Sequence, residues 1–131
     1  MKTLKSLVSW IEIPVTDMNR AKKFYEAILQ VKLQDAKLAS GLEMSFFPVE
    51  QTGTGGALCC VEEHYRPSKD GVVIYLTADP DIDTMLELVE KSGGRILQQK
   101  KQILESSDYG HMALFIDTEG NRIALYQGNK Q

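Results

Sequence analysis

Residues that cross-link or anchor a fold are scarce in this sequence. The two cysteines, Cys59 and Cys60, are adjacent, so they cannot join distant parts of the chain, and we expect reduced thiols in a cytoplasmic protein. No apolar run approaches the roughly 20 residues of a membrane-spanning helix. The opening stretch Met1–Ser6 leads into Trp-Ile-Glu-Ile-Pro, which is not the continuous apolar core of a secretory signal. We therefore expect neither a membrane nor a secretory destination.

Basic clusters and metal-binding motifs are also missing. The net charge is −3, and the lysine pairs at 22–23 and 100–101 are too short to form a nucleic-acid-binding face. His64 and His111 are the only histidines, and neither belongs to a His-x-x-x-His or Glu-x-x-His spacing. We expect them to be solvent-exposed or capping residues, with a metal site of His64, His111 and Glu12 as the alternative.

A strand pattern followed by an amphipathic helix occurs twice, about 63 positions apart. The first strand is expected over Leu7–Val15, with Asp17 as the helix N-cap. The second is expected over Val72–Ala78, with Asp79 as the N-cap and Pro80 in the first helical position. Two such openings in 131 residues indicate a duplicated module, which predicts a functional site between the halves.

Hydrophobic periodicity supports both helices and supplies the remaining strands. The expected apolar stripes are Ala21, Phe24, Tyr25, Ile28 and Leu29 in the first helix and Ile82, Met85, Leu86 and Val89 in the second, with Gly93 as C-terminal cap. Further strands are expected over Val31–Ala36, Glu43–Val49, Ala57–Val61, Arg95–Gln99, Met112–Asp117 and Arg122–Gln127. The glycine-rich stretch Gln51–Gly56 is interpreted as a hairpin turn, since it lacks the Gly-Lys-Ser/Thr ending of a phosphate loop.

The element order is therefore β-α-β-β-β, twice. It predicts an α+β fold in which two βαβββ modules form a cupped mixed sheet with the helices on its outer face. We expect a single domain over residues 1–131, with module one at about 5–62 and module two at about 70–128. The polar stretch Glu62–Gly71 joins the halves, either as a lid or as a simple linker.

Two sequence motifs resemble the vicinal oxygen chelate superfamily. The first combines Ile13-Pro14-Val15-Thr16-Asp17 with Arg20-Ala21 and Phe24-Tyr25. The second is the closing Asp117-Thr118-Glu119-Gly120-Asn121-Arg122-Ile123-Ala124-Leu125-Tyr126, where Thr118 replaces the family's usual proline. The superfamily contains glyoxalase I, extradiol dioxygenases, fosfomycin-resistance enzymes and bleomycin-resistance proteins. The resemblance implies paired βαβββ modules, often assembled across a homodimer.

The resemblance also implies where metal ligands would stand. In metal-using members they come from the first and last strand of each module. These positions fall on Trp10, Val73 and Ala124, with Cys59 or Cys60 as the fourth. Indole, isopropyl and methyl groups have no lone pair for a divalent ion, and one thiolate is not enough to hold it. We therefore expect no metal and no cofactor in this site.

Side-chain alternation along the strands predicts what lines the cup instead. Isoleucines and leucines at 11, 13, 74, 76, 123 and 125 should face the helices, which leaves the residues between them on the cup side. The predicted ligand-binding residues are Trp10, Glu12, Cys60, Tyr75, Arg122 and Tyr126. The alternative is that the aromatic side chains fill the cup as core. Glu12 is expected either to act as a base or ligand-binding carboxylate, or to form a salt bridge with Arg122 or another basic residue. Cys60 is either a reactive thiol or a buried structural one.

The leading functional hypothesis is a homodimeric protein that binds a small-molecule ligand without metal, as bleomycin-resistance proteins do. The alternative is a metal-dependent lyase, isomerase or dioxygenase with a displaced ligand set. A third hypothesis is a protein whose dimer surface is its function, with the cup filled. The residues leave open whether catalysis occurs, and no catalytic residue is assigned.

Overall fold

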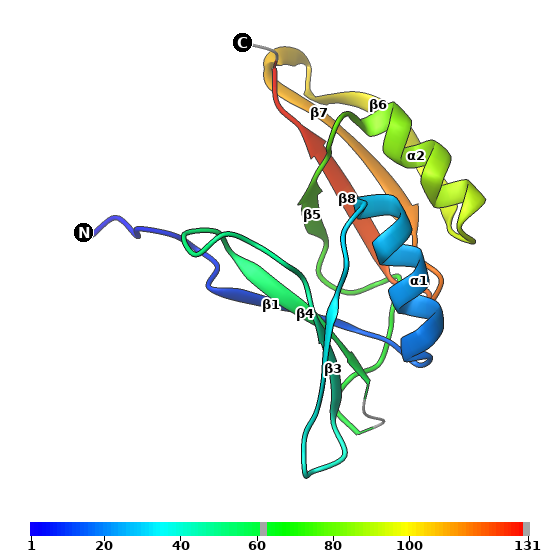
Figure 1. Ribbon diagram of the computed structural model, residues 1–131. Helices are drawn as coiled ribbons and strands as arrows, with labels where there is room; N and C mark the ends of the chain where they lie inside the picture. The colour runs from blue at the N-terminus through cyan, green and yellow to red at the C-terminus, as the bar shows by residue number, and fades with distance from the viewer. Residues whose placement is uncertain (61–62, 130–131) are drawn as a thin grey trace.

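Two modules of the same element order make up the chain (Figure 1). The computed structural model describes residues 1–60 and 63–129, with only the backbone at 106–108. Module one runs β1 (Trp10–Pro14), α1 (Met18–Leu29), β2 (Gln34–Lys37), β3 (Glu43–Phe46) and β4 (Gly55–Cys60). Module two runs β5 (Ile74–Thr77), α2 (Ile82–Lys91), β6 (Arg95–Leu104), β7 (Ser106–Ile116) and β8 (Arg122–Gln127). The predicted β-α-β-β-β order is confirmed in both halves. The expected strand end Val61 and linker start Glu62 lie outside the described residues.

The strands form two four-stranded mixed sheets. The order is β1-β4-β3-β2 in module one and β5-β8-β7-β6 in module two. In each sheet the first and last strands of the module pair in parallel, and the other pairs are antiparallel. The α+β fold of two βαβββ modules is therefore confirmed. Consequently β1 and β5, which open the two modules, are both edge strands.

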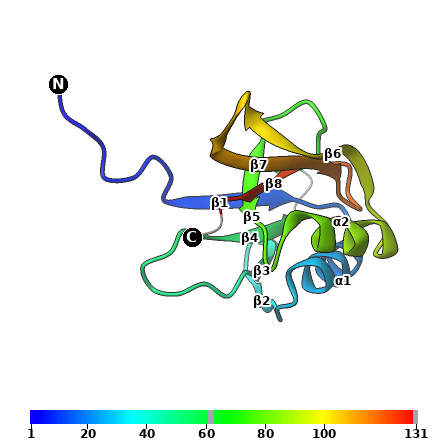
Figure 2. The same cartoon turned by 90° about the horizontal axis from the view of Figure 1, so that it is seen from above.

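Both helices lie side by side on the same side of the molecule (Figures 1 and 2). Their apolar stripes meet the inner faces of both sheets in one shared core. The rings of Phe24 on α1 and Phe115 on β7 lie with centroids 5.8 Å apart, so the core continues from one module into the other. Among the described residues, no helix is long and apolar enough to cross a bilayer. All predicted stripe residues are buried except Leu29, which is partly buried: Ala21, Phe24, Tyr25, Ile28, Ile82, Met85, Leu86, Val89.

The second helix begins two residues later than predicted. Asp79 was expected to cap it, but the N-cap is Asp81, whose side chain accepts from the Thr84 N–H at 2.7 Å. The Asp79–Pro80 peptide is cis, and Pro80 precedes the helix. The backbone N–H of Ile82, the first residue of α2, donates to the side-chain oxygen of Gln127 on β8 at 2.8 Å. The start of α2 is therefore fixed by a contact with the sheet as well as by local sequence.

The glycine-rich stretch is partly strand and not only a turn. Gly55 and Gly56 open β4 and pair with Trp10 and Ile11 of β1. A Cβ atom at Gly56 would lie 2.5 Å from the carbonyl oxygen of Ile11, closer than any side chain tolerates. The glycines therefore allow close approach of two backbones, which is consistent with rejecting a phosphate loop.

A buried carboxylate joins the end of module two to the start of module one. The Glu119 side chain is fully buried and accepts from the backbone N–H groups of Thr16 and Asp17, both at 2.9 Å. Arg20 donates to the same carboxylate from its Nε at 2.8 Å and from an Nη at 3.0 Å. The Thr118 hydroxyl adds a donor at 3.0 Å. Charge-assisted bonds of this kind are the stronger class of hydrogen bond in proteins.

The neighbouring turn residues extend this connection. Asn121 donates to the Pro14 carbonyl oxygen at 2.8 Å and accepts from the Ser68 N–H at 3.1 Å. Tyr25 of α1 donates its buried hydroxyl to Asp117. Burial and the charge of Asp117 raise the pKa of Tyr25 well above its ordinary value, so it stays a neutral donor. The turn 117–121 thus contacts β1, α1 and the segment between modules. We call it the inter-module joint.

We predict that Glu119→Gln destabilises the protein by about 3 kcal/mol at pH 7. Burial acts to raise the pKa of Glu119, but hydrogen bonds, from Arg20 first, hold it at about 2. A glutamine amide would place a donor against the donors of Arg20 and Thr118. The free energy of unfolding, measured by chemical denaturation, checks the loss.

The pH dependence provides the second arm of this test. Because the folded pKa of Glu119 is depressed, its stabilisation is complete above about pH 4.5 and is lost as the pH falls toward 2. The difference between wild type and Glu119→Gln should therefore shrink at low pH. Glu87→Gln, on the exposed face of α2, is the matched control and should change little. An equal loss from both variants would contradict the role of Glu119.

Candidate functional site

Each sheet has one face against the shared core and one facing away from it. Ile13, Ile123 and Leu125 lie in the core, as the alternation predicted. The residues between them therefore lie on the opposite face of each sheet, which points away from the helices and the shared core. From here on we call this the outer face. We call these the module-one face, with Trp10, Glu12, Phe46 and Cys59, and the module-two face, with Tyr75, Arg122, Ala124 and Tyr126.

On the module-one face, the Glu12 carboxylate accepts two neutral hydrogen bonds. The Tyr65 hydroxyl donates to one oxygen at 2.7 Å, and the Trp10 indole N–H donates to the other at 3.3 Å. The Trp10 ring lies against Phe46 with centroids 5.9 Å apart and is still 45% exposed. Gly55 beneath it makes room, because a Cβ there would lie 3.3 Å from the indole. The face therefore combines a held carboxylate with an accessible aromatic wall.

Glu12 also influences the acidity of its neighbours. Its hydrogen bond is the main cause that raises the pKa of Tyr65 to about 12, with burial second. Burial, followed by the charge of Glu12, raises the pKa of the Cys59 thiol to about 12. Both groups are therefore protonated near neutral pH. A thiol in that state is a weak nucleophile.

Cys60 lies on the opposite side of β4 from Cys59. It packs against the shared core, and its Sγ lies 3.8 Å from the carbonyl oxygen of Thr16. Leu58, on the same side of the strand, is completely buried in that core. Of the two thiols, Cys59 is therefore the one that shares the face with Glu12.

The module-two face carries two exposed tyrosines above a small buried residue. Tyr75 is 49% exposed and Tyr126 is 38% exposed. Ala124 pairs with Tyr75 across β5 and β8 and is fully buried. The Tyr126 hydroxyl lies close to Gly110, where an added Cβ would come within 3.2 Å of it. This arrangement offers aromatic surface on the two tyrosines, while the methyl group of Ala124 is covered.

Arg122 is held by a neutral acceptor and not by a carboxylate. One Nη donates to the Gly71 carbonyl oxygen at 3.1 Å, and the buried Nε has no hydrogen-bond partner. The expected alternative, an ion pair between Arg122 and Glu12, does not occur within the described part of the chain. Glu12 and Arg122 lie on different modules, and each forms hydrogen bonds with neutral partners of its own.

The two outer faces do not close on one another through strand pairing. Among the described helices and strands, α1 and α2 are the only elements from different modules whose Cα atoms approach within 8 Å. The structure therefore brings Trp10 together with Glu12, and Tyr75 together with Arg122 and Tyr126, but it does not join the two groups through adjacent strands.

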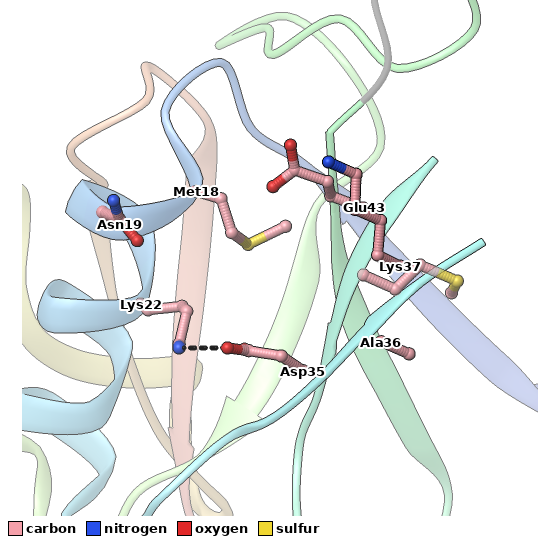
Figure 3. A pocket seen from close by; sticks show the side chains of 8 residues that line it. Met18, Asn19, Lys22, Asp35, Ala36, Lys37 and Glu43 are labelled. Carbon is pink, nitrogen blue, oxygen red and sulfur yellow. Dashed lines mark hydrogen bonds and ion pairs between the residues drawn. The ribbon is translucent and has the colours of Figure 1, made fainter. Parts of the chain in front are cut away.

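Two surface hollows lie away from the six predicted residues. One, of about 270 Å³, lies between α1 and the β2–β3 hairpin, where Lys22 forms an ion pair with Asp35 at 2.8 Å (Figure 3). The Ser45 hydroxyl donates to the same carboxylate at 2.8 Å, and the pKa of Asp35 is lowered by its bonds to Lys22 and Ser45. The other hollow, of about 500 Å³, lies at the start of α2 beside Lys100. The charges of Lys22 and Asp35 in the first hollow already neutralise one another.

The residues that could hold a metal do not converge. His64 is 78% exposed and lies 3.9 Å from Glu63. Over residues 1–60 and 63–129, no three His, Cys, Asp or Glu side chains form a group able to hold an ion. The alternative site of His64, His111 and Glu12 is thus not assembled. At the positions implied by the superfamily, Trp10 and Ala124 lie on the outer faces without donor atoms for a metal.

Phe46 and Tyr65 at the module-one face were not predicted, and Cys59 was named only as the alternative to Cys60 at an implied ligand position. The placement of Phe46 and Cys59 follows from the register of β3 and β4, and the burial of Leu58 assigns Cys59 to the outer face. Tyr65 comes from the segment between modules, where no periodicity applies. No sequence signal identifies its contact with Glu12.

Comparison with known proteins places this geometry in a family. The model of the Glyoxalase/Bleomycin resistance protein/Dioxygenase superfamily matches residues 7–125. A glyoxylase-like domain-containing protein of Didymella fabae is 32% identical over 126 residues, which cover 93% of this chain and 94% of the fungal protein. The putative glyoxylase CFP32 of Mycobacterium bovis is 24% identical over 93% of this chain but only 46% of its own length.

Solved structures share the fold at low sequence identity. Glyoxalase I from Zea mays superimposes with a TM-score of 0.66 and 21% identity, over 91% of this chain and 45% of the maize chain. TnmS3, an antibiotic binding protein from Streptomyces sp. CB03234, gives a TM-score of 0.61 and 22% identity, over 98% of this chain and all of its own. The chain thus spans about half the length of the mycobacterial and maize proteins.

We predict that Tyr65→Phe loosens the segment between the modules. Losing the hydroxyl removes one of the two bonds to Glu12 and should lower the free energy of unfolding by about 1 kcal/mol. The same loss should speed native-state tryptic cleavage after Lys69. Tyr109→Phe, which alters an exposed tyrosine on β7, is the matched control. Unchanged proteolysis in Tyr65→Phe would show that this bond does not hold the segment.

Proposed function

Because the chain belongs to the glyoxalase/bleomycin resistance protein/dioxygenase superfamily, we propose that it binds a small, aromatic organic molecule without the superfamily's metal ion. The proposed contacts are made by the outer faces of the two sheets, through Trp10, Glu12, Tyr75, Arg122 and Tyr126. Cys60, the sixth predicted residue, lies on the core side of β4, so it would support that strand and would not contact the ligand. The protein would work in a reducing compartment such as the cytoplasm, since both cysteines are free thiols.

The observation that carries the proposal is the exposure of aromatic side chains beside fixed polar groups. Exposed patches of large apolar side chains on soluble proteins commonly mark binding sites. Tyr75 and Tyr126 are both more than a third exposed on the module-two face, and Trp10 is exposed to a similar extent beside Glu12 on the module-one face. Aromatic walls with a few placed polar groups are typical of ligand sites.

The chemistry of the implied metal positions supports the metal-free part. An indole, an isopropyl group and a methyl group supply no lone pair, and the remaining position offers at most a thiol. The thiol on the outer face is Cys59, and one thiol is not enough to hold a divalent ion. These residues do not fit a divalent ion.

A relative of the same length points in the same direction. TnmS3 is described as an antibiotic binding protein and is covered over its whole length by this fold. The glyoxylase names of the fungal and mycobacterial relatives favour a second candidate, a metal-dependent lyase, isomerase or dioxygenase with a displaced ligand set. Metal analysis of the purified protein separates the two candidates.

We also propose that a second copy of the chain completes the site. The edge strands β1 and β5 are unpaired on their outer sides, and Val8, Trp10, Val72 and Tyr75 near them are exposed. Pairing the module-one face of one copy with the module-two face of another would cover these apolar side chains. In a two-fold dimer this places two identical sites between the copies.

We predict that aromatic compounds change the fluorescence of Trp10, the only tryptophan, and do so equally after treatment with EDTA. Tyr75→Ala and Tyr126→Ala should each weaken binding about tenfold through lost aromatic contact. Tyr109→Ala, at an exposed tyrosine elsewhere, should leave it unchanged. Stoichiometric metal in the purified protein, with binding lost on its removal, would support the second candidate.

A mixing experiment tests the shared site. If each site takes Trp10 from one copy and Tyr75 from the other, Trp10→Ala and Tyr75→Ala proteins should each bind poorly. Subunit exchange between the two variants should restore about a quarter of the sites, because half of the dimers are mixed and each has one intact site. No recovery after exchange, verified by sedimentation analysis, would mean that both residues act within one chain.

A further inference from the structure

We infer that the small molecule bound on the module-two face carries a carboxylate, and that Arg122 recognises it. This inference rests on the proposed function and specifies the ligand class. It follows from one observation that the fold does not explain, namely that a guanidinium on this face lacks an anionic partner.

The hydrogen-bonding state of Arg122 leaves most of its donors free. A guanidinium has five N–H donors, and in the described part of the chain Arg122 uses one of them, on the Gly71 carbonyl oxygen at 3.1 Å. Its Nε–H is buried and has no hydrogen-bond partner, an arrangement that is unfavourable for a polar group. No carboxylate of the described residues lies within 4 Å of it. Arg20 of α1, by contrast, donates two hydrogen bonds to the Glu119 carboxylate.

The surroundings of Arg122 favour an anionic group attached to a flat apolar body. Alternation along β8 places Arg122, Ala124 and Tyr126 on one face, and Tyr75 lies beside Ala124 on the neighbouring strand. Their partners on β7, Met112, Leu114 and Ile116, form the apolar layer of the sheet at this place, of which Met112 and Ile116 are buried. A ring packed against the exposed Tyr75 and Tyr126 would direct a substituent toward the end of the face where Arg122 lies.

The charge on this face suits a carboxylate better than a phosphate. One guanidinium offers a planar fork that matches two carboxylate oxygens and one negative charge. The other basic residues in register on this face, Arg95 and Lys101, lie on β6, two strands away from β8, so no second lysine or arginine lies on β5 or β8 beside Arg122. Gly71, which holds one Nη in place, is a neutral acceptor and does not compete electrostatically with an anion.

The test compares four probes that share a naphthalene ring: 2-naphthoate, 2-naphthalenemethanol, 2-naphthalenemethylammonium and 2-naphthyl phosphate. Affinities are measured by isothermal titration calorimetry on the full chain. The wild type should bind 2-naphthoate about tenfold or more tightly than the alcohol, as expected for a charge-assisted bidentate contact. The ammonium and phosphate probes should bind more weakly than the carboxylate.

Variants assign the preference to Arg122. Arg122→Gln should abolish the preference for 2-naphthoate, so that the carboxylate and the alcohol bind alike. Arg122→Lys, which keeps the charge but loses the fork, should retain only part of the preference. Lys23→Gln, at an exposed lysine on α1, removes one positive charge away from both faces and is the matched control, which should keep the wild-type preference. Chemical denaturation verifies that each variant is folded.

The outcomes separate this inference from the proposed function. Equal binding of all four probes, or a carboxylate preference that survives in Arg122→Gln, overturns the inference but leaves a small-molecule site. A preference for 2-naphthyl phosphate replaces carboxylate with phosphate and also overturns it. If no naphthalene probe binds at all, both the proposed function and the inference fail.

Discussion

The Glu119 carboxylate is the interaction on which the arrangement of both modules depends. It is fully buried and draws together the start of α1 and the last turn of module two, through Thr16, Asp17 and Arg20. Beside it, Asn121, which precedes β8 by one residue, donates a hydrogen bond to the carbonyl oxygen of Pro14, the last residue of β1. The strands β1 and β8, which carry residues of the module-one face and the module-two face, are therefore connected at this turn. A shift in this joint would move the aromatic residues of both faces at once.

The parts of the fold that sequence periodicity predicted are those with a regular apolar face toward the shared core. The two helical stripes and the strand Arg122–Gln127 match the structure because their apolar residues repeat with a clear period. The long β6–β7 hairpin was predicted only in part, at 95–99 and 112–117. Its middle is polar and exposed on both faces, and three irregularities interrupt the register, so no period of two appears there. The cap of α2 was misplaced by two residues because Asp79 and Asp81 have equal local propensity. The contact of Ile82 with Gln127, 45 residues away, decides between them.

The candidate site was predictable to the level of sheet faces but not of individual contacts. Alternation assigns Trp10 and Tyr126 correctly to the outer faces, since a strand side chain has only two directions to choose from. The partners of Glu12 depend on where a loop passes, and the loop residue Tyr65 obeys no such rule. The expected pairing of Glu12 with Arg122 fails for a related reason: both lie on outer faces, but the faces belong to sheets whose strands do not meet. The sequence positions of two residues and the sheet face on which each lies do not determine the distance between their side chains.

The absence of that ion pair has a chemical consequence for the site. Glu12 is held by neutral donors from Tyr65 and Trp10, and Arg122 by a neutral acceptor, Gly71. Each charge is oriented without being cancelled, so each remains available to a group of opposite sign. Where metal-using members of the superfamily place ligands around one ion, this chain has an indole and a methyl group, with the charges moved two positions along the strands from Trp10 and Ala124. Recognition on such a surface would be carried by complementary organic charge and aromatic contact, which is the chemistry of binding an organic molecule directly.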